Sequence, residues 1–169
     1  MKIGFIGLGN VGGKLAGSLF RNKFDLTVYD LDKSVADKFK SKGVKIVNSV
    51  DELTQNVDVI ITCLPSPKTC ADVMLNENGI LKNISQNKIW IEMSTTDQKE
   101  IIKLGKLVKE KGAIPLEAPV SGGCHRAATG NIAIFVGGER TAFDKVLPIL
   151  TCMGRKILHV GELGSASIL

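Results

Sequence analysis

The sequence alternates short apolar runs with longer amphipathic segments, and this alternation restricts the fold more than any other feature. The runs are rich in valine and isoleucine, and several, such as Val59-Ile60-Ile61, contain no polar residue. Strands that helices cover on both faces have this continuous apolar character, whereas half-exposed strands alternate apolar and polar residues. Strands that alternate with helices are typical of a parallel sheet wrapped by helices. The expected strands comprise residues 2–6, 26–29, 45–47, 57–63, 88–93, 113–117, 132–136 and 155–160.

Three of the amphipathic segments, residues 11–21, 97–111 and 141–153, carry apolar side chains at helical spacing. Pro148 is expected to kink or end the third, because proline lacks a backbone N–H and its ring clashes with the preceding turn. No repeat or long linker interrupts the pattern. The sequence therefore predicts one α/β domain over residues 1–160, with a doubly wound, mostly parallel sheet of the Rossmann type.

Length and composition agree with one globular domain. The chain has 169 residues, of which 44% are hydrophobic and 23% charged, and this excludes disordered, collagen-like and disulfide-stapled classes. Its four cysteines and two histidines lack metal-binding spacing, so we expect reduced thiols and no metal site. No apolar run is long enough for a membrane-spanning helix, and the first residues lead directly into a strand. We therefore expect no membrane partner and a cytoplasmic location.

The net charge of +5 arises from 22 basic and 17 acidic residues that are spread along the chain. The densest basic stretches, residues 33–45 and 99–111, also contain acidic residues, and they form either solvated helix faces or a nucleic-acid surface. Aromatic residues make up only 5% of the chain and leave little for stacking on bases. We expect solvated helix faces and no nucleic-acid partner.

A glycine-rich loop joins the first expected strand to the first expected helix. Gly7, Gly9 and Gly12 have the spacing G-x-G-x-x-G in the strand-loop-helix context that binds dinucleotides. The first glycine allows a tight turn, the second lets a pyrophosphate approach the backbone, and the third lets the helix pack on the strand. Free N–H groups at the helix N-terminus attract the phosphates. The alternative is that the glycines only shape the turn.

Asp30 ends the expected second strand, where an acidic residue hydrogen-bonds the ribose hydroxyls of adenosine. A carboxylate at this position repels a 2′-phosphate, so the sequence favours NAD over NADP. A basic residue that reaches over, from Arg21, Lys23 or Lys33, would soften this preference. The alternative role for Asp30 is an ordinary strand-end turn together with Asp32.

A second loop of small residues follows the strand expected at residues 113–117. Ser121, Gly122 and Gly123 come after its carboxyl end, where open α/β sheets bind ligands. Backbone N–H groups and the Ser121 hydroxyl could hold a carboxylate there without a metal. The alternative is a tight connection that needs glycine only for its geometry.

These motifs together resemble the β-hydroxyacid dehydrogenase family, which includes 3-hydroxyisobutyrate, tartronate semialdehyde and 6-phosphogluconate enzymes. The resemblance covers essentially the whole chain. It implies that Leu64-Pro65 lies along the cofactor, that Thr69 stands where an asparagine often contacts the cofactor, and that Thr95 of Ser94-Thr95 lies near the nicotinamide. It also implies that Ser121-Gly122-Gly123 holds the substrate carboxylate. The residues expected to contact the cofactor are Gly7, Leu8, Gly9, Asn10, Val11, Gly12, Asp30, Leu64, Pro65, Thr69 and Thr95.

The sequence departs from the family pattern in two places. Around the serine-glycine loop, Glu117 and Arg126 replace an aspartate and a glycine; Arg126 is either a contact to an acidic substrate or an exposed loop residue. The family also continues into a long helix whose lysine is the catalytic acid/base. Along the motif that begins at Gly161, this lysine would fall immediately after Leu169, so residues 161–169 are expected to lead to a helical second domain.

The resemblance implies hydride transfer between a nicotinamide and a small 3-hydroxyacid, by a full-length NAD-dependent enzyme that forms homo-oligomers through the helical domain. Without that domain and its lysine, these 169 residues are expected to bind NAD and to turn over no substrate. His125 is a candidate replacement for the lysine, or else a plain loop residue. Two other functions are a catalytically silent nicotinamide-binding, redox-sensing module and a methyltransferase.

Overall fold

The computed structural model describes residues 1–121 and 127–169. Within these ranges, nine strands form one sheet in the order β3-β2-β1-β4-β5-β6-β8-β7, and β9 also pairs with β8. The strands are β1 (Lys2–Ile6), β2 (Asp25–Tyr29), β3 (Lys45–Ile46), β4 (Val59–Thr62), β5 (Ile89–Glu92), β6 (Ile114–Glu117), β7 (Val120–Ser121), β8 (Ile132–Gly138) and β9 (Gly154–Gly161). The helices are α1 (Asn10–Arg21), α2 (Lys33–Lys40), α3 (Val50–Asn56), α4 (Pro67–Leu75), α5 (Ile80–Asn83), α6 (Gln98–Glu110) and α8 (Arg140–Met153).

The sheet is mostly parallel, which confirms the expected doubly wound fold. Strands β1 to β6 run in one direction, and β8 reverses relative to β6 and β7. The chain builds outward from β1 to β3 on one side and then returns to add β4 on the other. The strand order thus reverses between β1 and β4.

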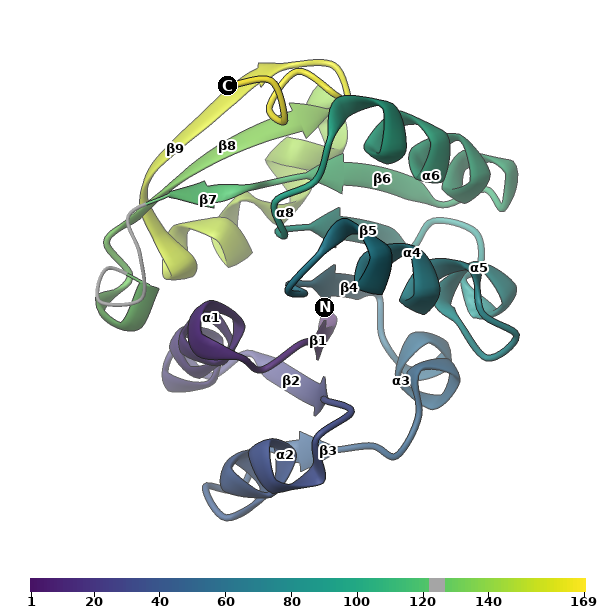
Figure 1. Cartoon of the computed structure of the whole chain (residues 1–169). Coiled ribbons are helices and arrows are strands. Elements are labelled where there is room, and N and C mark those ends of the chain that lie inside the picture. The colour runs from purple at the N-terminus through teal and green to yellow at the C-terminus, as the bar shows by residue number, and fades with distance from the viewer. Residues whose placement is uncertain (122–126) are drawn as a thin grey trace.

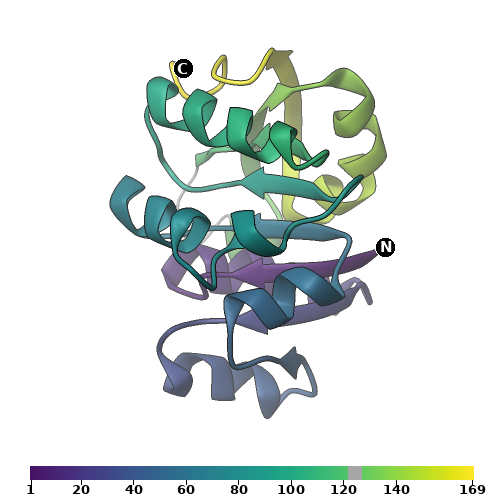
Figure 2. The same cartoon turned by 90° about the vertical axis from the view of Figure 1, so that its right-hand side faces the viewer.

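Two helical layers cover the sheet (Figures 1 and 2). On one face, α1, α2 and α8 bury side chains such as Leu15, Phe39 and Phe143 against it. On the other, α3, α4, α5 and α6 do the same around a second apolar cluster that includes Trp90 and Ile101. Burial on both faces explains why the central strands contain so few polar residues.

Side-chain caps define where several helices begin. Asp32, Ser49, Ser66 and Asp97 each accept a hydrogen bond from a backbone N–H in the first turn of the helix that follows. Such caps satisfy N–H groups that have no partner within the helix. Gly9, which precedes α1, offers no side-chain cap, and the first turn of α1 therefore keeps its N–H groups for another acceptor.

The expected strands and helices are present within two residues of their predicted bounds. Of the two expected effects of Pro148, to kink or to end the third helix, the second does not occur, because α8 continues to Met153. Val146, Ile149 and Leu150, fully buried, hold this helix on the sheet, and this packing outweighs the lost hydrogen bond. No helix of the described ranges is long and apolar enough to cross a membrane.

Candidate functional site

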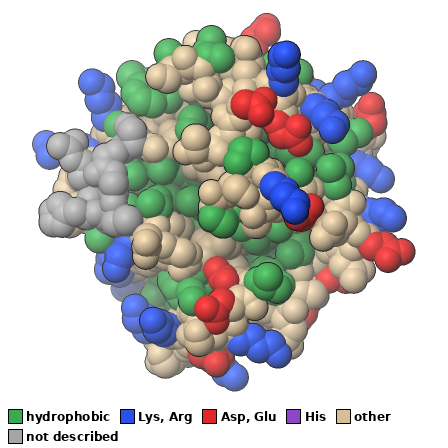
Figure 3. Space-filling view, in the orientation of Figure 1, with side chains coloured by type: hydrophobic (Ala, Val, Ile, Leu, Met, Phe, Trp, Pro, Cys, Tyr) green, Lys and Arg blue, Asp and Glu red, His purple; other side chains and the backbone are tan. Residues whose placement is uncertain are grey.

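A cleft of about 900 Å³ lies beside the point where the strand order reverses. The loop between β1 and α1, the carboxyl ends of β2 and β4, and helix α4 form its walls. Strand β1 points toward the viewer in Figure 1, so Figure 3 shows the face at the carboxyl ends of the parallel strands. Hydrophobic side chains gather in the middle of this face, and lysines and arginines lie mainly at its rim. Open α/β sheets bind their ligands at this position.

The three motif glycines differ in why they lack a side chain. Gly7 has a φ of +100°, and a Cβ there would collide with the backbone of Cys63. A Cβ on Gly12 would collide with the carbonyl of Gly7. A Cβ on Gly9, in contrast, would meet no atom within 4 Å, and its φ of −69° suits any residue. The fold requires glycine at positions 7 and 12 but not at position 9, where the open space faces the cleft.

The first turn of α1 is suited to an anion. The helix has no side-chain cap and no acidic residue in its first turn, and Asn10, Val11 and Gly12 line the cleft. Uncapped N–H groups and the positive end of the helix dipole attract phosphates at such a site.

Asp30 projects into the same cleft with a fixed carboxylate. Its Oδ2 accepts a hydrogen bond from Leu8 N at 2.7 Å, and its Oδ1 accepts one from Asp32 N at 2.8 Å. Each carboxylate oxygen has a further lone pair. The two oxygens can therefore each accept a hydroxyl proton from a vicinal diol such as a ribose.

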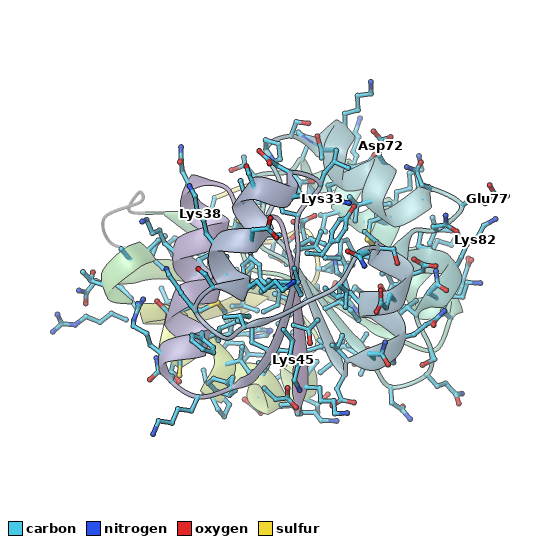
Figure 4. All side chains as sticks on the ribbon, turned by 90° about the horizontal axis from the view of Figure 1, so that it is seen from below. Lys33, Lys38, Lys45, Asp72, Glu77 and Lys82 are labelled. Carbon is cyan, nitrogen blue, oxygen red and sulfur yellow. The ribbon has the colours of Figure 1, made fainter. Side chains whose placement is uncertain are left out.

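Three basic residues were expected near Asp30, and of these Lys33 lies on the side of the cleft. Arg21 ends α1 and donates to Ala128 O at 2.8 Å, and Lys23 precedes β2, so both lie toward the amino ends of the strands. Lys33 and Asp72 lie toward the carboxyl ends, opposite Lys45 (Figure 4). No ion pair within the described ranges involves Asp30.

The cleft brings together nine of the eleven residues predicted to contact a cofactor: Gly7, Gly9, Asn10, Val11, Gly12, Asp30, Leu64, Pro65 and Thr69. Leu8 is buried, although its N–H holds Asp30. Thr95 is exposed just beyond β5 and does not line the cleft. Ser121 ends β7, which pairs with β8. The predicted residues Gly122, Gly123, His125 and Arg126 lie outside the described residues.

Sequence reasoning missed the part of the cleft beyond Asp30. Leu31, which is 88% exposed, borders it. The other residues that line this part are Asn48, Ser49, Val50, Asp72, Val73, Asn76, Asn78 and Gly79. Asn48 follows β3 at its carboxyl end, so the rule that ligands bind at such ends gave a usable signal. No comparable signal in the sequence pointed to the cleft residues of α4.

A buried polar cluster lies behind the cleft wall at the ends of β4 and β5. Glu92 is fully buried there; burial raises its pKa, and hydrogen bonds from Cys70, Ser94 and Thr62 oppose the rise. Burial and the neighbouring Glu92 raise the pKa of Cys63 to about 12, and they also raise that of Cys70. These thiols are protonated at neutral pH, and thiols in that state are poor nucleophiles.

We expect Cys63 to resist alkylation although it borders the cleft. The pKa of about 12 compares with 9.0 for a free thiol, so at pH 8 the thiolate fraction should fall about 1,000-fold on folding. Iodoacetamide labelling in a Cys70→Ser, Cys124→Ser, Cys152→Ser background, with and without urea, measures this. Labelling at similar rates in both conditions would contradict a protonated, buried thiol.

A second buried carboxylate anchors the C-terminal segment. Glu117, the register partner of Glu92, is fully buried at the end of β6. Its Oε1 accepts backbone N–H groups from Ala166 at 2.5 Å and Ser167 at 2.9 Å. His159, near the end of β9, contacts Gly138 O through Nε2 at 2.8 Å.

The cleft geometry agrees with comparisons to known proteins. The family described as the NAD binding domain of 6-phosphogluconate dehydrogenase matches residues 2–161. The chain belongs to this family. It is thus an NAD-binding domain related to the hydroxyacid dehydrogenases, and the resemblance drawn from its motifs is confirmed.

Individual relatives in this family are dehydrogenases and reductases. Mitochondrial 3-hydroxyisobutyrate dehydrogenase of Rattus norvegicus is 37% identical over 96% of this chain and 49% of its own length. The chloroplastic glyoxylate/succinic semialdehyde reductase 2 of Arabidopsis thaliana is 33% identical over 99% of the chain and 47% of its own length. The chain spans about half the length of these relatives.

Two solved structures are also similar to almost the whole of this chain. Mycobacterium tuberculosis 3-hydroxyisobutyrate dehydrogenase with L-serine superposes with a TM-score of 0.93 and 28% identity, over 99% of this chain and 56% of that one. Psf3 in complex with NADP+ and 2-OPP gives a TM-score of 0.94 and 25% identity, over 98% and 59%.

Proposed function

We propose that residues 1–160 form the cofactor domain of an NAD-dependent dehydrogenase that acts on a small 3-hydroxyacid, of the 3-hydroxyisobutyrate or tartronate semialdehyde type. The observation that carries the proposal is Gly9. The fold leaves room for a side chain there, yet the chain keeps glycine where a pyrophosphate would approach the uncapped end of α1. When bound, the nicotinamide carries the hydride, and the protein positions the cofactor and excludes water.

Asp30 supports NAD as the preferred cofactor. Its fixed carboxylate presents two acceptors to the ribose hydroxyls and repels a 2′-phosphate. Of the three basic residues expected to offset that repulsion, Arg21 and Lys23 lie toward the far end of the strands, and Lys33 lies on the side of the cleft.

For the substrate, we propose that Ser121, Gly122 and Gly123 hold the carboxylate, as the family resemblance implies. The names of the mammalian and mycobacterial relatives support a hydroxyacid of this size. Proton transfer would belong to the lysine that the family pattern puts immediately after Leu169, on a helix to which residues 161–169 lead. That helical half would also mediate homo-oligomerisation. We propose the cytoplasm as the location of the protein.

Titration of the 169-residue chain with NADH, followed by nicotinamide fluorescence, tests the proposal. We expect saturable NADH binding, no binding of S-adenosylmethionine, and no oxidation of 3-hydroxyisobutyrate. Removal of a proton-transfer residue typically costs about 100- to 10,000-fold in rate. A chain that ignores NADH at millimolar concentration would overturn the cofactor assignment, and one that oxidises the hydroxyacid would overturn the role of the lysine.

A further inference from the structure

Glu92 is a carboxyl group in an otherwise apolar strand. It ends the run Ile89-Trp90-Ile91 in the middle of the sheet and is fully buried. No lysine or arginine within the described ranges forms an ion pair with it. A buried carboxyl that lacks a cation persists only where hydrogen bonds compensate for its lost hydration.

The compensating hydrogen bonds come from several segments of the chain. Glu92 Oε1 accepts the N–H of Ser94 at 2.8 Å, and Oε2 contacts Cys70 Sγ. Polar interactions with the side chains of Thr62 and Ser94 also oppose the rise in the pKa of Glu92. Four polar groups therefore converge on this one carboxyl.

Two of these groups, the hydroxyls of Thr62 and Ser94, also form hydrogen bonds with other residues. The Thr62 hydroxyl accepts Trp90 Nε1–H at 3.0 Å, and the Ser94 hydroxyl accepts the N–H of Leu64 at 2.7 Å. A hydroxyl that accepts an N–H keeps its own proton to donate. Each hydroxyl therefore has a proton that it can donate to Glu92.

The segments held in this way form one half of the cleft. Leu64 and Pro65 line it directly, and Cys70 follows the cleft residue Thr69, while Ser94 does not line the cleft but binds the N–H of Leu64. Leu64 and Pro65 follow β4, Cys70 belongs to α4, and Ser94 follows β5. Asp30 lies on the other side of β1, at the end of β2. A dinucleotide that spans the reversal point has its adenosine half on the β2 side and its nicotinamide half on the β4–β5 side.

We propose that Glu92 is a positioning residue for the nicotinamide half of the dinucleotide. It accepts the N–H of Ser94, and the hydroxyl of Ser94 in turn accepts the N–H of the cleft residue Leu64. Glu92 therefore contributes to binding of the nicotinamide half and not to binding of the adenosine half. The inference rests on the proposed function, because it requires that the cleft binds a nicotinamide dinucleotide.

The test compares NADH with ADP-ribose, which has the adenosine and both phosphates but no nicotinamide. In Glu92→Gln, an amide that donates replaces an oxygen that accepts, so part of the network loses its acceptor. We expect NADH to bind about 10-fold more weakly and ADP-ribose to bind within about twofold of the wild type. Ser94→Ala, which removes the hydroxyl that binds the Leu64 N–H but keeps the Glu92 carboxyl, should change the ratio of the two affinities in the same direction.

Glu117→Gln is the matched control. Glu117 is equally buried on the adjacent strand, but its hydrogen bonds go to Ala166 and Ser167. It should leave the ratio of NADH to ADP-ribose affinity unchanged. The same ratio change in Glu117→Gln, or an equal loss of both ligands in Glu92→Gln, would overturn the proposal. If Glu92→Gln does not fold, an unchanged ratio in Ser94→Ala overturns it. Failure of the wild type to bind NADH would instead reject the proposed function.

Discussion

Replacing Gly9 with valine is expected to abolish dinucleotide binding while the chain remains folded. The valine side chain would occupy the open space in front of α1, through which a pyrophosphate reaches the backbone N–H groups. We expect NADH affinity to fall at least about 100-fold. The free energy of unfolding should fall by only about 1 kcal/mol, because valine is a poorer residue than glycine before a helix. Fluorescence titration and urea unfolding measure the two quantities.

The same substitution at Gly12 provides the control. A Cβ there collides with the backbone carbonyl of Gly7, and backbone is less able to move than the end of a side chain. We expect Gly12→Val to lower the free energy of unfolding by about 3 kcal/mol or more. If Gly9→Val unfolded the chain to the same extent, or if it still bound NADH normally, glycine at position 9 would not reflect a ligand.

The parts of the site that the sequence could predict depend on local chemistry. The glycine loop and Asp30 belong to consecutive elements, and their roles follow from a turn, a helix end and a strand end. Leu64, Pro65 and Thr69 could be placed only through the family resemblance. Asp72 and Asn76 enter the cleft because α4 packs over β4, and no local pattern contains that packing.

The fold shows the same division between local and long-range information. Long, strongly periodic segments such as α6 were predicted to within a residue at either end. Strand β7 and helix α5 are short, with two and four residues, and they carry too few positions for a period to be visible. Glu92 could be recognised as unusual from its apolar neighbours alone. Its partners Cys70 and Thr62 could not, because parallel pairing and helix packing bring them together.

The second large effect is expected at Asp30, where substitution should remove much of the preference for NADH over NADPH. Wild-type protein should bind NADH about 100-fold more tightly than NADPH. In Asp30→Asn the negative charge is lost, and hydrogen bonds to charged groups contribute about 1.5–3 kcal/mol each. We therefore expect NADH affinity to fall about 10- to 100-fold and the preference over NADPH to shrink to about tenfold or less.

Asp32→Asn distinguishes the charge at the cleft from charge nearby. Asp32 caps α2 through Ser34, a role that asparagine also fills, and it does not line the cleft. Its substitution removes the same charge two residues away and should leave the ratio of NADH to NADPH affinity unchanged. Equal ratios in the two variants would mean that the general negative potential selects the cofactor. If the ratio changes only in Asp30→Asn, the cofactor is selected by direct contact with the Asp30 carboxylate. The hydrogen bonds from Leu8 and Asp32 hold this carboxylate in place.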